Sequence, residues 1–191
     1  MDDISKAVTM DVKNPGDLVY AVGLTKDELG ASEFLRYYGD KIIRQHYVGD
    51  NVPKVNADTA KRIYNAIGQA TDKRLIRSSH TPTKGGLGIA LAKTAFAGGY
   101  GLDIELKRLP STASTNYSAL YSESNSRFVI TIDPANEAVF RKIMGTIPYN
   151  KIGVVRTDEQ FNVKGVDGVE VIHDNIYDMK KDWKSTLEKV K

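Results

Sequence analysis

Cysteine is absent from the 191 residues of the chain. This absence excludes disulfide bonds, thiolate metal sites and cysteine nucleophiles, and it favours a cytosolic location. The sequence also lacks any stretch approaching the roughly 20 apolar residues that a membrane span needs. Its first residues, Met1 to Ile4, show no cationic region followed by an apolar one, as a secretory signal would. We therefore expect a cytoplasmic protein without a membrane partner.

An excess of one charge is also missing, because 27 basic residues stand against 24 acidic ones, a net charge of +3. Proteins that bind nucleic acid usually gather Lys and Arg on one face. The densest basic group lies late on a predicted helix, where cations suit the helix dipole. Its members are Lys180, Lys181, Lys184, Lys189 and Lys191. We therefore expect no nucleic-acid partner.

Histidine is scarce as well, and the three histidines are scattered along the chain as His46, His80 and His173. Without cysteine or clustered carboxylates they match no recognisable zinc spacing. The sequence therefore predicts no metal site.

Hydrophobic periodicity predicts alternating strands and helices with interposed turns. Strands are expected at 18–22, 75–79, 102–106, 128–132, 152–156, 161–163 and 169–173. Helices are expected at 30–38, from the cap Asn56 to about Gly68, at 86–98, at 134–144, and at 176–190 with the apolar stripe Ile176, Met179, Trp183, Leu187 and Val190. The segments 39–54 and 110–118 are expected to be loops. This order predicts an α/β (α+β) fold, in which a mixed β-sheet is layered with helices. It favours a single domain at 15–191, preceded by an arm at 1–14.

The segment from Arg77 to Leu87 holds the strongest candidate for chemistry, because it joins a predicted strand to a helix start. Gly85 and Gly86 would let a phosphate approach the outward-pointing backbone N–H groups, and Lys84 could add a positive charge. The alternative, which physical reasoning favours, is that the two glycines permit close packing of the helix on the sheet. The spacing matches neither a P-loop nor the dinucleotide-binding fingerprint.

Several segments together resemble the carboxy-terminal domains of the aminoimidazole ribonucleotide synthetase superfamily. That superfamily typically shows His-Asp, a short variable stretch, Gly-Gly-Leu and an alanine-rich helix, and here the stretch runs from His80 to Gly99. Glu28 to Phe34 is similar to the Glu-Leu-Gly-Gly-Ser motif of phosphoribosylformylglycinamidine synthases of the subunit II type. The segment from Leu120 to Val129 resembles their Leu-Phe-Ser-Glu-Ser…Arg segment. These matches occur in family order, together with 15–19 and 152–155.

The resemblance implies a domain of an ATP- and Mg²⁺-dependent carbon–nitrogen ligase of purine biosynthesis. Such an enzyme converts formylglycinamide ribonucleotide to formylglycinamidine ribonucleotide, with ammonia from a glutaminase subunit and with a small accessory subunit as a further partner. In this family a long chain holds two copies of a paired-domain unit, the second of them degenerate. The arm at 1–14 would then lead from an amino-terminal ATP-binding domain that this chain lacks.

One position indicates which copy the chain resembles, and one segment indicates a candidate pocket. Thr81 stands where the superfamily carries an acidic residue that could bind Mg²⁺, which points to the degenerate copy. Glu123, Ser124 and Asn125 align with a segment that contributes to substrate binding in the catalytic copy, so the resemblance predicts a polar pocket edge. A capped, solvent-facing turn is the alternative for these three residues, and it is slightly favoured.

The sequence thus predicts substrate- or nucleotide-binding contacts at Glu123, Ser124, Asn125, His80, Lys84, Gly85 and Gly86, no catalytic residue, and no cofactor bound by this chain alone. A second hypothesis is a non-catalytic scaffold and subunit-docking module, which should carry a large exposed apolar patch. A third is the equivalent domain of a selenophosphate synthetase, a thiamine-phosphate kinase or a hydrogenase-maturation protein.

Overall fold

Strand β1 (Leu18–Val22) is buried on both faces in the computed structural model, which describes residues 3–188. Val19 and Ala21 point into one hydrophobic cluster, and Leu18, Tyr20 and Val22 point into a second cluster on the opposite face. Because successive side chains of a strand alternate between faces, only an uninterrupted apolar run suits this position. The predicted buried strand at 18–22 is confirmed.

The sheet has seven strands in the order β2-β4-β1-β5-β3-β6-β7. The other six strands are β2 (Ile76–His80), β3 (Leu102–Glu105), β4 (Phe128–Ile132), β5 (Tyr149–Val155), β6 (Gln160–Lys164) and β7 (Glu170–Asn175). Neighbouring strands are antiparallel except β3 and β6, which run parallel. The predicted mixed sheet is therefore confirmed.

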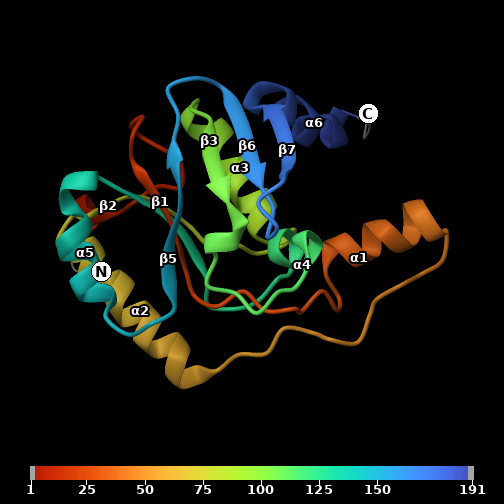
Figure 1. Cartoon of the computed structure of the whole chain (residues 1–191), viewed down its shortest axis with the longest axis horizontal. Helices are drawn as coiled ribbons and strands as arrows, with labels where there is room; N and C mark the ends of the chain where they lie inside the picture. Colours follow the sequence, from red (N-terminus) through yellow and green to blue (C-terminus); the bar gives the residue numbers. More distant parts are fainter. Residues whose placement is uncertain (1–2, 189–191) are drawn as a thin grey trace.

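Helices cover the sheet on both faces (Figure 1). They are α1 (Glu33–Tyr38), α2 (Ala57–Asp72), α3 (Gly86–Gly98), α4 (Asn116–Tyr121), α5 (Glu137–Met144) and α6 (Ile176–Glu188), with the short helical turns η1 (Ile4–Lys6), η2 (Gly39–Ile43), η3 (Leu106–Arg108) and η4 (Pro134–Asn136). The first cluster packs α3, α4 and the start of α6 against the sheet, and the second packs α2 and α5. The layered arrangement of sheet and helices is the predicted one.

The second helical layer leaves part of the sheet uncovered. Its buried cluster draws on β1, β2 and β4 and contains no residue of β3, β6 or β7. A polar cavity of about 510 Å³ lies over this half of the sheet, lined in part by Asp103, Lys151 and Asn162. Asp103 accepts hydrogen bonds there from Arg156, at 2.6 Å, and from Asn162, at 3.0 Å. Polar side chains therefore take the place of a packed helix on this face.

Residues 3–14, most of the predicted arm, lie against the domain. The backbone N–H of Ser79 donates to the carbonyl oxygen of Thr9 at 3.0 Å, and Val12 is buried against α3. A side chain at Gly98 would collide with the backbone of Val12, so the small residue at the end of α3 makes room for the arm. The arm is thus part of the packing of the domain, and the boundary at residue 14 stays a prediction.

The two predicted loops were partly wrong. The segment 39–54 begins with the π-helical turn η2 and is irregular after it. The segment 110–118 contains the start of α4, which is held by a capping box between Thr115 and Ser118. Ser and Thr favour both loops and helix caps because their hydroxyls bond nearby backbone groups, so composition alone did not distinguish the two.

Two predicted helices differ in detail. Helix α2 begins at the predicted cap Asn56 but continues past Gly68 to Asp72, and Tyr64 lies on its exposed side. The helix after Asp133 opens as the turn η4 before α5 begins at Glu137. Gly68 meets no neighbouring atom within 4 Å, so nothing there forces the helix to end.

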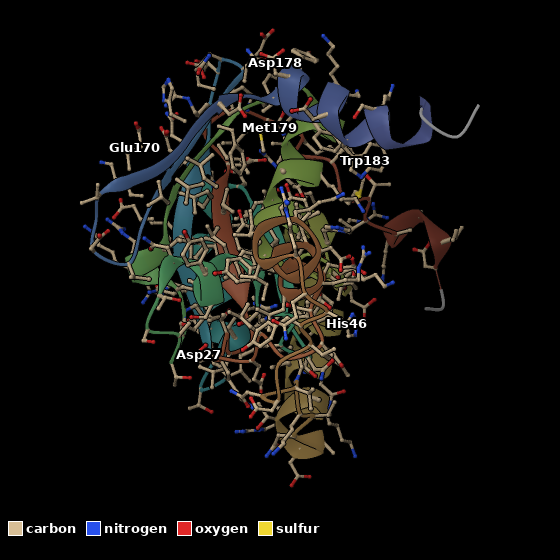
Figure 2. The ribbon with its side chains drawn as sticks, turned by 90° about the vertical axis from the view of Figure 1, so that its right-hand side faces the viewer. Asp27, His46, Glu170, Asp178, Met179 and Trp183 are labelled. Carbon is tan, nitrogen blue, oxygen red and sulfur yellow. The ribbon has the colours of Figure 1, made fainter. Side chains whose placement is uncertain are left out.

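Helix α6 lies across α3 near the top of the molecule in Figure 2, with Met179 and Trp183 labelled. The indole ring of Trp183 packs on Phe96 of α3 at a centroid distance of 5.6 Å, and Lys93 lies 5.9 Å from the same indole. The predicted stripe therefore faces α3 at Ile176, Met179 and Trp183. Its remaining members, Leu187 and Val190, lie outside the residues whose side chains are described, as do Lys189 and Lys191.

Candidate functional site

The motif segments Glu28–Phe34 and Leu120–Val129 meet at one end of the sheet, where the guanidinium of Arg127 bonds residues of the second segment and Thr25, which precedes the first. This side chain is almost fully buried. Its Nε donates to the carbonyl oxygen of Ser124 at 2.8 Å, one Nη to Thr25 Oγ1 at 2.9 Å, and the other to the carbonyl oxygen of Ser122. Burial lowers the pKa of Arg127 to about 10, against the opposing effect of Glu28 and Glu123. The group therefore carries its charge at neutral pH.

Glu28 and Ser124 complete this polar network. The backbone N–H of Glu28 donates to Ser122 Oγ at 3.3 Å. The side-chain Oε1 of Glu28 accepts from the backbone N–H of Lys54 at 3.3 Å. Ser124 is buried, and its Oγ accepts from the backbone N–H of Lys26 at 3.1 Å. Buried polar groups rigidify a structure when they are hydrogen-bonded, so these contacts hold the two loops together.

The carboxylate of Glu123 caps two helix starts. Its Oε1 accepts the backbone N–H of Glu33, in the first turn of α1, at 3.0 Å, and the backbone N–H of Gly85, just before α3, at 2.8 Å. The N–H of Gly86 donates to the carbonyl oxygen of Thr83 at 2.9 Å. A carboxylate of the chain itself thus occupies the position that an external anion would take at this turn.

Close packing explains Gly86. Its φ is +66°, and a Cβ there would lie 2.7 Å from the carbonyl oxygen of Ser122 and 2.8 Å from that of Leu120. A side chain at this position would therefore separate α3 from the segment that follows α4. The alternative interpretation of the glycine pair, close packing, thus has a specific geometric basis at this position.

Lys84 and His80 lie apart from the buried network. Lys84 is 83% exposed and pairs with Glu33 at 3.5 Å. His80 ends β2 half-buried, and burial, with a smaller effect from Lys93, lowers the pKa of its imidazole. A histidine with a lowered pKa is neutral at pH 7. Thr81, the position of the expected acidic residue, is exposed.

Asn125 lies on the rim of a different space, a pocket of about 330 Å³ beside the start of α2. Three cationic side chains line this pocket, from Lys26, Lys54 and Arg62. Sequence reasoning missed all three, because they come from three separate segments and no motif contains them. Of the seven predicted contacts, the structure joins Glu123 directly to Gly85 and places Asn125 at this pocket. The binding roles themselves stay predictions.

The chain also exposes an apolar segment at 34–55, called here the excursion, which extends to one side of the molecule and returns to α2 (Figure 1). His46 lies within it (Figure 2). Its exposed large apolar side chains are those of Tyr37, Tyr38, Ile42, Ile43, Tyr47, Val48, Val52 and Val55. A groove of about 660 Å³ runs beside α1, between Leu29, Tyr38 and Tyr117 among others.

Aromatic stacking fixes the position of Phe34 in the lining of this groove. The ring of Phe34 stacks on Tyr121 at a centroid distance of 5.0 Å with the planes 2° apart, and on Tyr117 at 5.4 Å. The groove therefore has a fixed wall. The scaffold hypothesis expects an exposed apolar patch, and this segment carries exposed apolar side chains; the docking role stays a prediction.

Among the described residues, no three His, Cys, Asp or Glu side chains gather as a metal site would require. None of the helices in residues 3–188 is long and apolar enough to cross a membrane.

Residues 14–166 match the family described as "AIR synthase related protein, C-terminal domain". The chain belongs to this family. The match includes the Arg127 network, the turn before α3 and six of the seven strands, and β7 lies beyond it. The resemblance inferred from the ordered motifs is therefore confirmed.

Phosphoribosylformylglycinamidine synthase subunit PurL of Alkaliphilus metalliredigens is 31% identical over an alignment of length 191, which covers 98% of this chain and 24% of that protein. The PurL of T. maritima in complex with FGAR aligns with a TM-score of 0.75 at 19% identity, covering 91% of this chain and 29% of that one. E. coli HypE, a hydrogenase maturation protein, aligns with a TM-score of 0.61 at 17% identity, covering 88% and 52%. The chain thus spans about a quarter of the length of the PurL proteins it matches, and the structural alignments support the predicted fold.

Proposed function

We propose that this AIR-synthase-type domain works within a PurL-type ligase, which converts formylglycinamide ribonucleotide to formylglycinamidine ribonucleotide in purine biosynthesis. The identity to PurL of Alkaliphilus metalliredigens extends over nearly the whole chain. T. maritima PurL has been solved in complex with FGAR and, in another structure, in complex with ATP. The parent enzyme would use ATP with Mg²⁺ to activate the amide oxygen, and ammonia would then displace phosphate.

We further propose that this domain contributes structure rather than catalysis. The carboxylate of Glu123 carries this proposal, because it bonds the N–H groups of Gly85 and Glu33 where a phosphate would otherwise bind. Thr81, four residues before Gly85 in the chain, offers no charge to a metal ion. A turn that is already neutralised by its own chain has little affinity for a second anion, since like charges repel.

The partners in this proposal are the other domains of the same enzyme. The arm at 1–14 would lead from an ATP-binding domain, and the groove of the excursion is an apolar surface for packing against that domain. A glutaminase subunit and a small accessory subunit would complete the complex, in keeping with the PurLQS assembly of T. maritima.

The equivalent domain of a hydrogenase maturation protein is a weaker candidate. HypE shares the fold, but its TM-score is 0.61 against 0.75 for PurL. The Glu28–Ser32 segment, which resembles the PurL motif, also favours the ligase.

A domain replacement tests the ligase assignment. This chain would replace the equivalent quarter of Alkaliphilus metalliredigens PurL, and ATP hydrolysis dependent on formylglycinamide ribonucleotide and ammonia would be measured. We expect the hybrid to keep activity, and a matched hybrid that carries the HypE domain to lose it. Equal activity of both hybrids, or none in either, would count against a PurL-specific role.

The chain by itself tests the structural role. We expect no turnover with ATP, ammonia and formylglycinamide ribonucleotide, and no ATP binding stronger than about 1 mM by calorimetry. The complete PurL of Alkaliphilus metalliredigens, under the same conditions, is the positive control. Turnover by the isolated chain would contradict a structural role while leaving the ligase assignment intact.

A further inference from the structure

A further pocket, of about 500 Å³, lies between α5, β5 and η3. It is separate from the motif segments, because its lining comes from residue 20 and from residues 108 and 137–151. Pockets of roughly 300–1,000 Å³ are the usual size for small-molecule sites. The residues that line it suggest what it could bind.

The pocket concentrates positive charge. Arg108, Arg141 and Lys151 line it against a single carboxylate, that of Glu137. Arg108 is paired with Glu105 at 2.9 Å. Arg141 and Lys151 have no acidic partner within 4.0 Å among the side chains that the structure describes. Arg141 and Lys151 thus lie in the same pocket without forming an ion pair with a described side chain.

The lining of the pocket includes a part-buried hydrogen bond between two of its side chains. Tyr20 is 1% exposed on strand β1, and its hydroxyl donates to Glu137 Oε1 at 2.6 Å. Burial and the bond to Glu137 raise the pKa of Tyr20, so the hydroxyl stays protonated. Because a carboxylate has about four acceptor positions, Glu137 can still accept from a ligand hydroxyl.

The remaining walls are held in place by specific contacts. Asn150 Nδ2 donates to the carbonyl oxygen of Arg108 at 2.7 Å, and this bond ties η3 to β5. The ring of Tyr149 stacks on Tyr20 at a centroid distance of 6.1 Å, with the planes 27° apart. The cations, the carboxylate and an aromatic wall therefore converge on one space.

We propose that this pocket binds a phosphate monoester that carries hydroxyl groups, with the phosphate on Arg141 and Lys151 and a hydroxyl on Glu137. Hydrogen bonds between cations and phosphate oxygens are strong because both partners are charged. The carboxylate would be unfavourable beside a bare phosphate and selects a ligand that also offers a donor. This inference is independent of the ligase assignment, since neither the Glu123 turn nor the excursion takes part.

Calorimetry on the complete chain tests the site with three probes: ribose 5-phosphate, ribose and inorganic phosphate. We expect ribose 5-phosphate to bind with a Kd below about 1 mM, and each of the other two to bind at least tenfold more weakly. Arg141→Ala and Lys151→Ala should each weaken binding of ribose 5-phosphate by about tenfold or more.

The neighbouring Lys142→Ala is the matched control, because Lys142 is exposed on the same helix, carries the same charge and does not line the pocket. Its affinity should remain that of the unchanged chain. The proposal is overturned if ribose 5-phosphate does not bind, or if inorganic phosphate binds as tightly. Equal weakening by Lys142→Ala would also overturn it, because that result would mean a non-specific effect of net charge.

Discussion

The turn before α3 and the pocket between α5 and β5 differ in how their charges are satisfied. At the turn, the amide of Gly85 already bonds Glu123, and the nearby Lys84 pairs with Glu33. In the pocket, Arg141 and Lys151 have no acidic partner among the described side chains. The turn resembles an anion site in sequence but is neutralised by its own chain. The pocket has no sequence signature and keeps its charges available, so a motif indicates where chain segments meet rather than whether a ligand fits there.

The largest effect should come from Arg127→Met. This change leaves two carbonyl oxygens and a threonine hydroxyl without their donor and removes the charge beside the buried Glu28. Removing one member of a buried charged network typically costs about 3–5 kcal/mol. Urea denaturation should show that loss in the free energy of unfolding. Arg62→Met, an exposed change at the Asn125 pocket, should stay within about 0.5 kcal/mol. A loss below about 1 kcal/mol for Arg127→Met would mean that the Arg127 network contributes little to the stability of the domain.

Two glycine substitutions, at Gly86 and Gly68, test whether close packing requires a glycine at the turn before α3. Gly86→Ala should destabilise the chain by about 2 kcal/mol or more, because φ is +66° and the new Cβ would meet backbone oxygens. Gly68→Ala, in the interior of α2 and free of neighbours, should instead stabilise by about 0.5–1 kcal/mol. The midpoints of thermal unfolding should move in opposite directions. If both midpoints rise, close packing does not explain Gly86.

The smallest expected effect comes from one substitution in each of the two charged regions, the turn before α3 and the α5–β5 pocket. Glu123→Ala removes a cap shared by α1 and α3 and should cost about 1–2 kcal/mol. Lys151→Ala, in the α5–β5 pocket, should change the free energy of unfolding by less than about 0.5 kcal/mol, since its side chain has no ion pair to lose. The free energies of unfolding are measured by urea denaturation. If Glu123→Ala and Lys151→Ala lower them equally, the turn before α3 and the α5–β5 pocket do not differ in how their charged groups are paired.

Much of the fold could be predicted because local patterns agree with the tertiary structure. The apolar run at 18–22 and the cap at Asn56 each have a local physical cause, and both are confirmed. The prediction was less accurate in polar segments. At 110–118, Ser and Thr serve equally well in a loop and in the capping box of α4. Element ends in such segments depend on contacts that the local sequence does not contain.

The candidate site was only partly predictable for a related reason. The ordered motifs identified the family and singled out the segments that meet at Arg127. They did not reveal that Glu123 would bond the amides of Gly85 and Glu33, because these three residues lie far apart in the chain. The cations around Asn125 were missed on the same ground.

The sequence by itself determined the family, the mixed sheet and the absence of thiol chemistry, because these depend on composition, local periodicity and the order of motifs. Only the tertiary structure decided which charged side chains have a hydrogen-bond or ion-pair partner within the chain. Glu123 and Gly85 are 38 residues apart, and Tyr20 and Glu137 are 117 apart, yet each pair is joined by a hydrogen bond. Hydrogen bonds require contact within about 3 Å, and for residues this distant in the chain only the folded arrangement of the sheet and its helices brings the partners together.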